Sequence, residues 1–240
     1  MWALEEARLP DREIIGQRYS DILDRDSGRI IADLSLRRCV FENCHLSEAT
    51  SPGTRTIVRK VVLSECAAKR CTVGPSVLDE VTIDGLRTAG LLQCWGTVFR
   101  RVTLRGRIGR LMISTLLSAS GSVSVAEVEA FRAANEPWIQ ATDWALDISR
   151  ASFEECDIRG IPSRFIRRDP DTQLVVRRER LVDGAWRALP LEGTYWPTIL
   201  DNAIRTGMDD VVLVAPRPNR VFPRMLEGLQ VLKHAGVAEA

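Results

Sequence analysis

A five-residue repeat is the feature that most constrains the fold of this chain. Cut into fives from Leu34, the sequence reads LSLRR, CVFEN and CHLSE, with a large apolar residue at every centre. The same pattern returns from Leu146 as LDISR, ASFEE and CDIRG. A period of five fits neither an α-helix nor a flat strand, so neither element can place all these apolar residues on one face. A chain that turns a corner every five residues can do so.

The repeat continues between these two stretches. Further pentads run from Val61 to Gly90 and from Thr97 to Gly106, after slips of two residues and of one residue. Five of the six cysteines occupy the small position two residues before a centre. Four sides make a square turn of about twenty residues, and stacked turns pair as parallel strands about 4.8 Å apart. We therefore expect both apolar positions to be buried along one axis.

This pattern resembles the pentapeptide-repeat family, and the resemblance covers about 70 of the 240 residues. It implies a mainly β fold, a right-handed quadrilateral β-helix, which is a parallel solenoid. The chain departs from the family pattern, because Cys, Leu or Val often stands where the family favours Ala. Where the family favours Asp or Asn before the centre, Asp is found here only at Asp147 and Asp157.

Three parts are expected along the chain. Residues 1–33 are assigned to an N-terminal cap, residues 34–162 to the β-helix and residues 163–240 to a small C-terminal α/β cap domain. The β-helix is interrupted by a helical insertion at about 124–142. This division follows from the need to cover the two open ends of a solenoid.

The helical insertion is indicated by a capping box. Ser124 stands three residues before Glu127, and the helix that follows has apolar residues on one side and is expected to stop at Pro137. The apolar residues of that side are Val125, Val128 and Phe131. The helix is expected to be an excursion that lies outside the axis of the β-helix.

The C-terminal residues predict two helices and three strands. The segment QLVVRRERLVDGAWRAL is typical of a β-hairpin around Asp183 and Gly184. A helix is expected over 197–206 with Gly207 at its end, followed by a strand over VVLVAP. A final helix ends at Gly236.

The charges favour ion pairs between turns. The net charge is +1, which argues against a strongly basic surface for DNA and against an acidic imitation of DNA. A turn of twenty residues plus a one-residue slip places three carboxylates beside three arginines of FRRVTLRGRIGR. The expected pairs are Asp79 with Arg100, Glu80 with Arg101 and Asp84 with Arg105. We interpret them as a ladder of exposed cross-strand ion pairs.

No motif for catalysis or metal binding is present. The chain lacks GxSxG, HExxH, P-loop and Rossmann signatures, and its cysteines form no CxxC pair. His45 is expected to point outward and His234 to lie in the last turn of a helix, neither with an obvious partner. Cysteine thiols inside an apolar core are inert. No catalytic residue, metal ligand or cofactor is therefore assigned.

A cluster of carboxylates on the final turn is the nearest approach to a hydrolytic pair. Glu154, Glu155 and Asp157 are expected on the surface beside Arg150 and Arg159. Solvated carboxylates in such a setting keep ordinary acidity and act as surface groups.

The interpretation that follows is a non-catalytic, protein-binding scaffold. A bacterial interaction protein that neutralises a toxin, as an immunity protein does, or that protects a target enzyme would accept its mixed surface. The alternatives are nucleic-acid binding through arginines, which the charge balance makes less favoured, and a carbohydrate-active β-helix enzyme. The candidate partner-binding residues are Glu127, Arg132, Glu136, Trp138, Arg164, Arg167 and Arg168.

A cytoplasmic location is expected, with no membrane partner. No apolar run reaches the roughly 18 residues that a membrane-spanning helix requires. The first residues, MWALEEARLPDREIIG, carry acids where a signal peptide has its apolar stretch.

Overall fold

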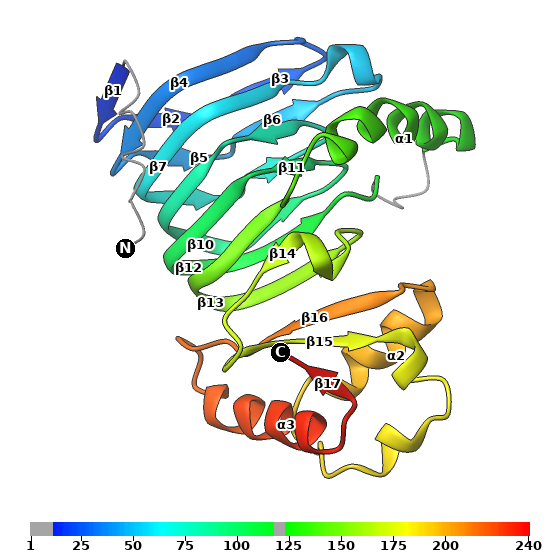
Figure 1. Cartoon of the computed structure of the whole chain (residues 1–240). Coiled ribbons are helices and arrows are strands. Elements are labelled where there is room, and N and C mark those ends of the chain that lie inside the picture. The colour runs from blue at the N-terminus through cyan, green and yellow to red at the C-terminus, as the bar shows by residue number, and fades with distance from the viewer. Residues whose placement is uncertain (1–11, 118–122) are drawn as a thin grey trace, which may run out of the picture.

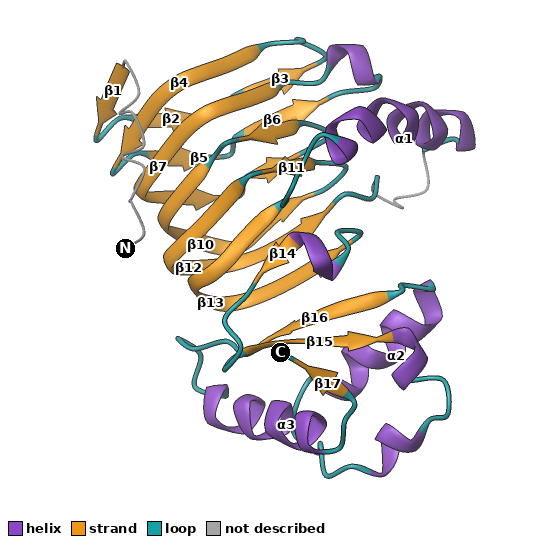
Figure 2. Ribbon diagram, viewed as in Figure 1, coloured by secondary structure: helices purple, strands orange, loops and turns teal. Residues whose placement is uncertain are grey.

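The computed structural model describes residues 12–117 and 123–240. The chain is mainly β, as the sequence predicts: a strongly curled parallel sheet is joined to a small antiparallel sheet and three α-helices (Figures 1 and 2). Residues 1–11 of the expected N-terminal cap lie outside the described residues.

The large sheet has fourteen strands. They are β1 (Arg12–Ile15), β2 (Arg18–Ser20), β3 (Leu23–Arg25), β4 (Ile30–Arg37), β5 (Val40–Glu42), β6 (His45–Glu48), β7 (Ile57–Lys69), β8 (Thr72–Val73), β9 (Val77–Asp79), β10 (Thr82–Cys94), β11 (Val98–Arg100), β12 (Val102–Ser114), β13 (Leu146–Arg159) and β14 (Ile166–Arg167). Parallel pairing groups them into successive layers. The first layer is β1 to β3, followed by β4 to β6, β7 with β8, β9 with β10, β11 with β12, and then β13.

The register of the layers matches the length of four pentads. Val62 pairs with Thr82 and Thr82 pairs with Thr103, which are offsets of 20 and 21 residues. The chain turns corners at residues with positive φ, and these recur every five positions at Lys60, Glu65 and Arg70. Non-glycine residues adopt this conformation only at a cost, so the surrounding pairing must hold it in place.

The predicted ion-pair ladder is confirmed between layers. The three pairs are Arg100 with Asp79 (2.5 Å), Arg101 with Glu80 (3.5 Å) and Arg105 with Asp84 (3.0 Å). One pair differs from the expectation, because the Asp79 side chain is buried rather than exposed. A buried carboxylate with a bidentate arginine is energetically unlike an exposed one.

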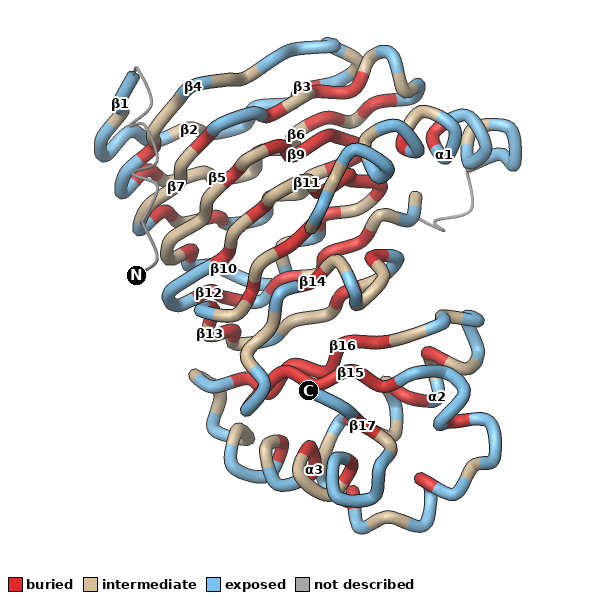
Figure 3. The backbone as a smooth tube through the Cα atoms, in the orientation of Figure 1, coloured by how far each residue is buried: buried red, intermediate tan, exposed pale blue. Residues whose placement is uncertain are grey.

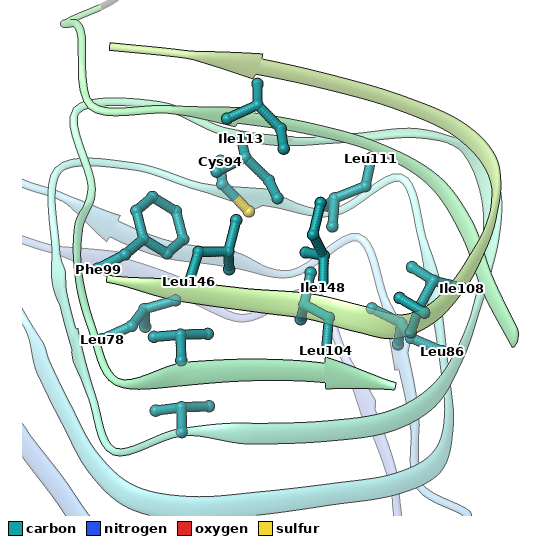
Figure 4. Packing of buried hydrophobic residues seen from close by; sticks show 14 of the residues in the cluster. Leu78, Leu86, Cys94, Phe99, Leu104, Ile108, Leu111, Ile113, Leu146 and Ile148 are labelled. Carbon is teal, nitrogen blue, oxygen red and sulfur yellow. The ribbon is translucent and has the colours of Figure 1, made fainter. Parts of the chain in front are cut away.

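The interior of the curled sheet is apolar. Side chains from successive layers, among them Leu78, Leu104 and Leu111, point toward one another (Figure 4). Phe153 is buried, whereas Phe41 is half-buried and stacks on Tyr19 with ring centroids 5.3 Å apart. All six cysteines are free thiols.

The sheet begins earlier than the repeat pattern indicated. Residues 12–33, which were assigned to the cap, form β1, β2, β3 and the start of β4. Each of the first three strands pairs in parallel with one strand of the second layer. The stretch RYSDILDR lacks the small residue before each centre, so its strands were not recognised from the repeat.

Helix α1 (Val125–Gln140) projects from the side of the sheet, and its capping box is confirmed. The expected stop at Pro137 is wrong. Pro137 lies inside the last turn, where it removes only its own N–H donor, and the helix continues to Gln140. Of the three apolar residues on one side of the helix, Phe131 is buried, whereas Val125 and Val128 are exposed.

The C-terminal residues form an antiparallel sheet of β15 (Gln173–Arg177), β16 (Asp210–Val214) and β17 (Ala238–Glu239), with α2 (Trp196–Thr206) and α3 (Phe222–His234). Both helices and the strand VVLVAP are confirmed. The predicted β-hairpin around Asp183 and Gly184 is not formed. The segment after β15 forms 3₁₀ turns at Arg178–Arg180 and Ala185–Ala188. β15 already has β16 and β17 on its two sides, and Leu181 and Trp186 bury themselves in the core instead of pairing.

The antiparallel sheet lies against the β13 side of the curled sheet. Figure 3 shows β15 and β16 buried for most of their length. Val175 and Val212 belong to the same buried cluster as Ile148 and Ile158 of β13. Gln173 Nε2 also donates to Ile148 O at 3.0 Å. The apolar interior is therefore covered at this end.

Candidate functional site

Helix α1 is anchored to the sheet by a buried arginine. Arg55 follows a 3₁₀ turn at Pro52–Thr54 and is only 7% exposed. Its Nη1 donates to Asn135 Oδ1 at 2.5 Å and its Nη2 donates to Ala134 O at 3.1 Å. Burial lowers the pKa of the Arg55 guanidinium, and within the described residues no carboxylate pairs with it. Two neutral oxygens of α1 therefore satisfy a buried cation, and this fixes the position of the helix.

A second anchor lies at the end of α1. The Arg100 guanidinium sits over the ring of half-buried Trp138, 5.8 Å from its centroid. The same guanidinium is held by two hydrogen bonds to Asp79, at 2.5 and 2.8 Å. The hydrogen bond that Arg100 donates to Asp79 outweighs the effect of burial and raises the pKa of Arg100. Trp138 therefore rests on a cation whose own position is fixed.

The contacts continue from Trp138 toward the C-terminal residues. Arg101 Nε donates to Asp143 Oδ1 at 3.1 Å, and this hydrogen bond lowers the pKa of Asp143. The Arg101 N–H donates to Trp144 O, and the Arg167 guanidinium lies 4.3 Å from the Trp144 ring centroid. We call this set the arginine–tryptophan row: Trp138, Arg100, Arg101, Asp143, Trp144 and Arg167.

The structure thus brings together two of the candidate residues, Trp138 and Arg167. Arg164 is exposed beside them in sequence, with its guanidinium 4.6 Å from the Phe165 ring centroid. Arg168 has a different environment. It is half-buried, it donates to Ser163 O and Ile166 O, and burial lowers its pKa. These hydrogen bonds are local, because their acceptors lie five and two residues before Arg168 in the chain.

The three remaining candidates lie on α1. Glu127 accepts hydrogen bonds from the Ser124 hydroxyl and N–H, which lower its pKa, so it serves the helix cap. Arg132 is exposed and pairs with Glu129 at 2.7 Å. Glu136 accepts from Gln140 at 2.8 Å. Eleven residues of helix, about 16 Å at 1.5 Å per residue, separate Glu127 from Trp138.

Sequence reasoning missed an exposed apolar stripe on α1. Val125, Val128 and Ile139 are 81%, 43% and 40% exposed. At 100° per residue these positions fall within about 60° of one another around the helix axis. The valines were noticed in the sequence as part of one side of the helix, but the pattern did not show that they remain exposed. We call these three residues the α1 stripe.

Acidic side chains on β13 are neutralised by arginines. The pairs are Glu154 with Arg107 (2.9 Å), Glu155 with Arg110 (2.6 Å) and Asp157 with Arg159 (2.5 Å). The expected neighbour Arg150 is replaced by two arginines of β12, because the layer before β13 lies directly beside it. Each carboxylate therefore has its own cation, which is the arrangement of a surface and not of a catalytic pair.

Histidine and cysteine side chains are also accounted for. His45 is hydrogen-bonded to Thr72 Oγ1 at 2.8 Å and lies 3.8 Å from Glu48, so the expectation of no partner is wrong. Burial raises the pKa of the Cys94 thiol to about 12. Within residues 12–117 and 123–240, no three His, Cys, Asp or Glu side chains are grouped to hold a metal ion.

No protein-family model, curated protein or solved structure matches this chain. The site must therefore be interpreted from its own geometry. None of the helices in the described part of the chain has the length and apolar character needed to cross a membrane.

Proposed function

We propose that the protein is a non-catalytic, protein-binding scaffold built on a right-handed quadrilateral β-helix of the pentapeptide-repeat kind. Parallel pairing at offsets of 20 and 21 residues supports this architecture. Positive φ values that recur at five-residue spacing in several layers and an interior that includes Leu, Phe and Cys side chains support it as well.

The observation that carries the binding proposal is the α1 stripe. Its three apolar side chains face away from the sheet on a helix that Arg55 and Trp138 hold in place. A helix fixed before binding loses little conformational entropy when a partner covers it. The charged side chains of Arg132 and Glu136 lie on the same side of the helix, between Val128 and Ile139, so a partner would contact apolar and charged groups together.

The partner proposed is a protein, such as a toxin or another enzyme that this protein neutralises or protects. Imitation of DNA needs unpaired carboxylates, and binding of nucleic acid needs unpaired arginines. On β12 and β13 the two kinds of charge pair with each other instead. Because the opposite charges are paired, the electrostatic potential of this surface is small, and it favours a partner that recognises shape and apolar area.

Affinity purification with matched variants tests the proposal. The stripe variant carries Val125→Ser, Val128→Ser and Ile139→Ser, and the control carries Val182→Ser, a change at a valine that is 76% exposed on the C-terminal residues. We expect the tagged wild type and the control to retain one protein in stoichiometric amount from the native host, and the stripe variant to lose it. Equal retention by all three, or recovery of nucleic acid alone in a salt-dependent manner, contradicts the proposal.

A further inference from the structure

An apolar cavity of about 290 Å³ lies inside the curled sheet. Its lining includes residues from the first layer, such as Tyr19, and from the layer of β13, such as Leu146. Five strand pairings separate these layers, and at about 4.8 Å per pairing the cavity extends roughly 24 Å along the axis. The cavity is therefore long and narrow.

The cavity exists because some central positions hold small residues. Leu36, Phe41 and Leu46 fill the centres of the second layer, whereas Ala68 stands at a centre of the third. Ala68 is buried and lines the cavity. A smaller side chain at a central position leaves space that the rigid backbone pairing cannot close.

The two ends of the cavity differ. Near β13, the apolar side chains of the antiparallel sheet cover the interior. At the first layer, Ile22 lines the cavity and is also exposed to solvent. Among the residues that the structure describes, β2 and β3 pair only with the second layer, so their outer edges have no strand beside them. Among the described residues, the exposed lining at this end is Ile22, and the entrance is therefore assigned beside it.

The volume is sufficient for an alkyl chain. An engineered apolar cavity of roughly 150 Å³ stays dry and binds benzene, which has six carbons. The cavity of this protein has about twice that volume, which corresponds to about twelve carbons and therefore admits a chain of about ten. Its length and width suit a linear chain better than a ring system.

One polar atom at the entrance gives the ligand an orientation. Asp24 lines the cavity and is 8% exposed. Its Oδ2 accepts hydrogen bonds from the Ser47 N–H at 3.1 Å and the Thr56 hydroxyl at 2.5 Å. Its Oδ1 is buried and has no hydrogen-bond partner in the described part of the chain. A buried carboxylate oxygen without a donor is costly, and a ligand that supplies one removes that cost.

Asp24 is ionised at neutral pH. Burial alone raises the pKa of its carboxyl group, but the nearby Ser27 hydroxyl and the hydrogen bonds from the Thr56 hydroxyl and the Ser47 N–H outweigh burial and lower it. Its Oδ1 is therefore an acceptor only, and it selects a donor over another carboxylate.

We propose that this cavity binds a single-chain amphiphile whose head group donates a hydrogen bond, either an alcohol or a primary amine. The head group lies at Asp24 Oδ1, and an alkyl chain of about ten carbons runs along the axis toward Leu146. This binding site is separate from the α1 stripe and does not depend on the protein-binding proposal.

Isothermal titration calorimetry with three probes below their micelle concentrations tests the proposal. The probes are decylamine, 1-decanol and decanoate, which share chain length and differ in the head group. We expect saturable 1:1 binding of at least one donor probe, and which of the two binds identifies the head group. Decanoate should bind at least tenfold more weakly, because its carboxylate is repelled by Asp24.

Two alanine variants provide a matched control. Ala68→Leu fills the cavity, and Ala67→Leu adds the same side chain at the neighbouring position, which points to the other face of β7 and does not line the cavity. We expect Ala68→Leu to weaken binding of the donor probe at least tenfold and Ala67→Leu to leave it unchanged. No saturable binding of either donor probe, equal binding of decanoate, or full binding by folded Ala68→Leu overturns the proposal.

Discussion

Two ion pairs in adjacent positions of the same ladder should differ greatly in their effect on stability. Arg100 binds Asp79, and the exposed fractions of the two side chains are 21% and 2%. Arg105 binds Asp84, and these side chains are 47% and 42% exposed. Both pairs join β-strands at an offset of 21 residues, so the backbone geometry is matched. The pairs differ chiefly in the burial of the carboxylate, and Arg100 also lies over the Trp138 ring.

The perturbation is Arg100→Met, which keeps most of the apolar stem and removes the guanidinium. It leaves the Asp79 carboxylate buried without its two hydrogen bonds, and breaking a buried pair in this way costs about 3–5 kcal/mol. The matched change Arg105→Met leaves a carboxylate that water can reach, and it should cost about 0–1 kcal/mol. The expected difference in the free energy of unfolding is therefore about 3 kcal/mol.

Urea unfolding followed by circular dichroism measures both variants against the wild type. A third protein with Asp79→Leu and Arg100→Met removes both charges, and it should recover most of the stability lost in Arg100→Met, because no buried charge is left unpaired. Equal losses for Arg100→Met and Arg105→Met, or no recovery in the double variant, would refute the reasoning from burial.

Three further predictions concern the anchor of α1, acid stability and thiol reactivity. Asn135→Ala removes one hydrogen-bond acceptor from the buried Arg55 guanidinium and should lower the free energy of unfolding by about 1–3 kcal/mol. Glu136 is exposed, and Glu136→Ala should change the free energy of unfolding by less than about 0.5 kcal/mol in the same urea titration. The pKa of Asp24 is lowered in the folded state, so its contribution to stability is complete above its unfolded pKa of about 4 and is lost as the pH falls through the folded value. The urea midpoint of Asp24→Asn should therefore fall less steeply between pH 4 and pH 2 than the midpoint of the wild type. Parallel slopes for the two proteins would contradict this role of Asp24. Cys94 should resist iodoacetamide at pH 8 in the native protein and react after unfolding, because burial raises its thiol pKa to about 12. Mass spectrometry of tryptic peptides measures the extent of labelling. Rapid labelling of Cys94 in the native protein would contradict this prediction.

Local patterns carried the correct predictions. The five-residue period predicted which carboxylates stand beside which arginines, because a constant offset between layers follows from a constant turn length. The capping box at Ser124 and the apolar stripe of α2 with Gly207 after it were also visible, since each depends on residues within one or two turns of helix.

The incorrect predictions share one cause. The helix of residues 125–140 was expected to stop at Pro137, but it continues to Gln140, and its Asn135 binds Arg55, eighty residues earlier in the chain. The segment after β15 has the turn residues of a hairpin, but two other strands, separated from it in sequence, already occupy both edges. A periodic pattern identifies a face and not the neighbour that covers it.

The candidate site was predictable only in part. Trp138 and Arg167 were named from their positions near the insertion and the junction, but the contacts that join them run through Arg100 and Arg101 of another layer. The cavity was not predictable at all, because a repeat that places small and large residues on one axis does not state whether their volumes fill it.

The amino-acid sequence alone determined the mainly β character of the chain, the register of its layers and the residues that point inward, because these depend on spacing along the chain. The tertiary structure decided which side of α1 remains exposed, which carboxylate of the ladder is buried and where the interior is left empty. These depend on how side chains far apart in sequence meet in space, and on whether their volumes and hydrogen bonds match when they do.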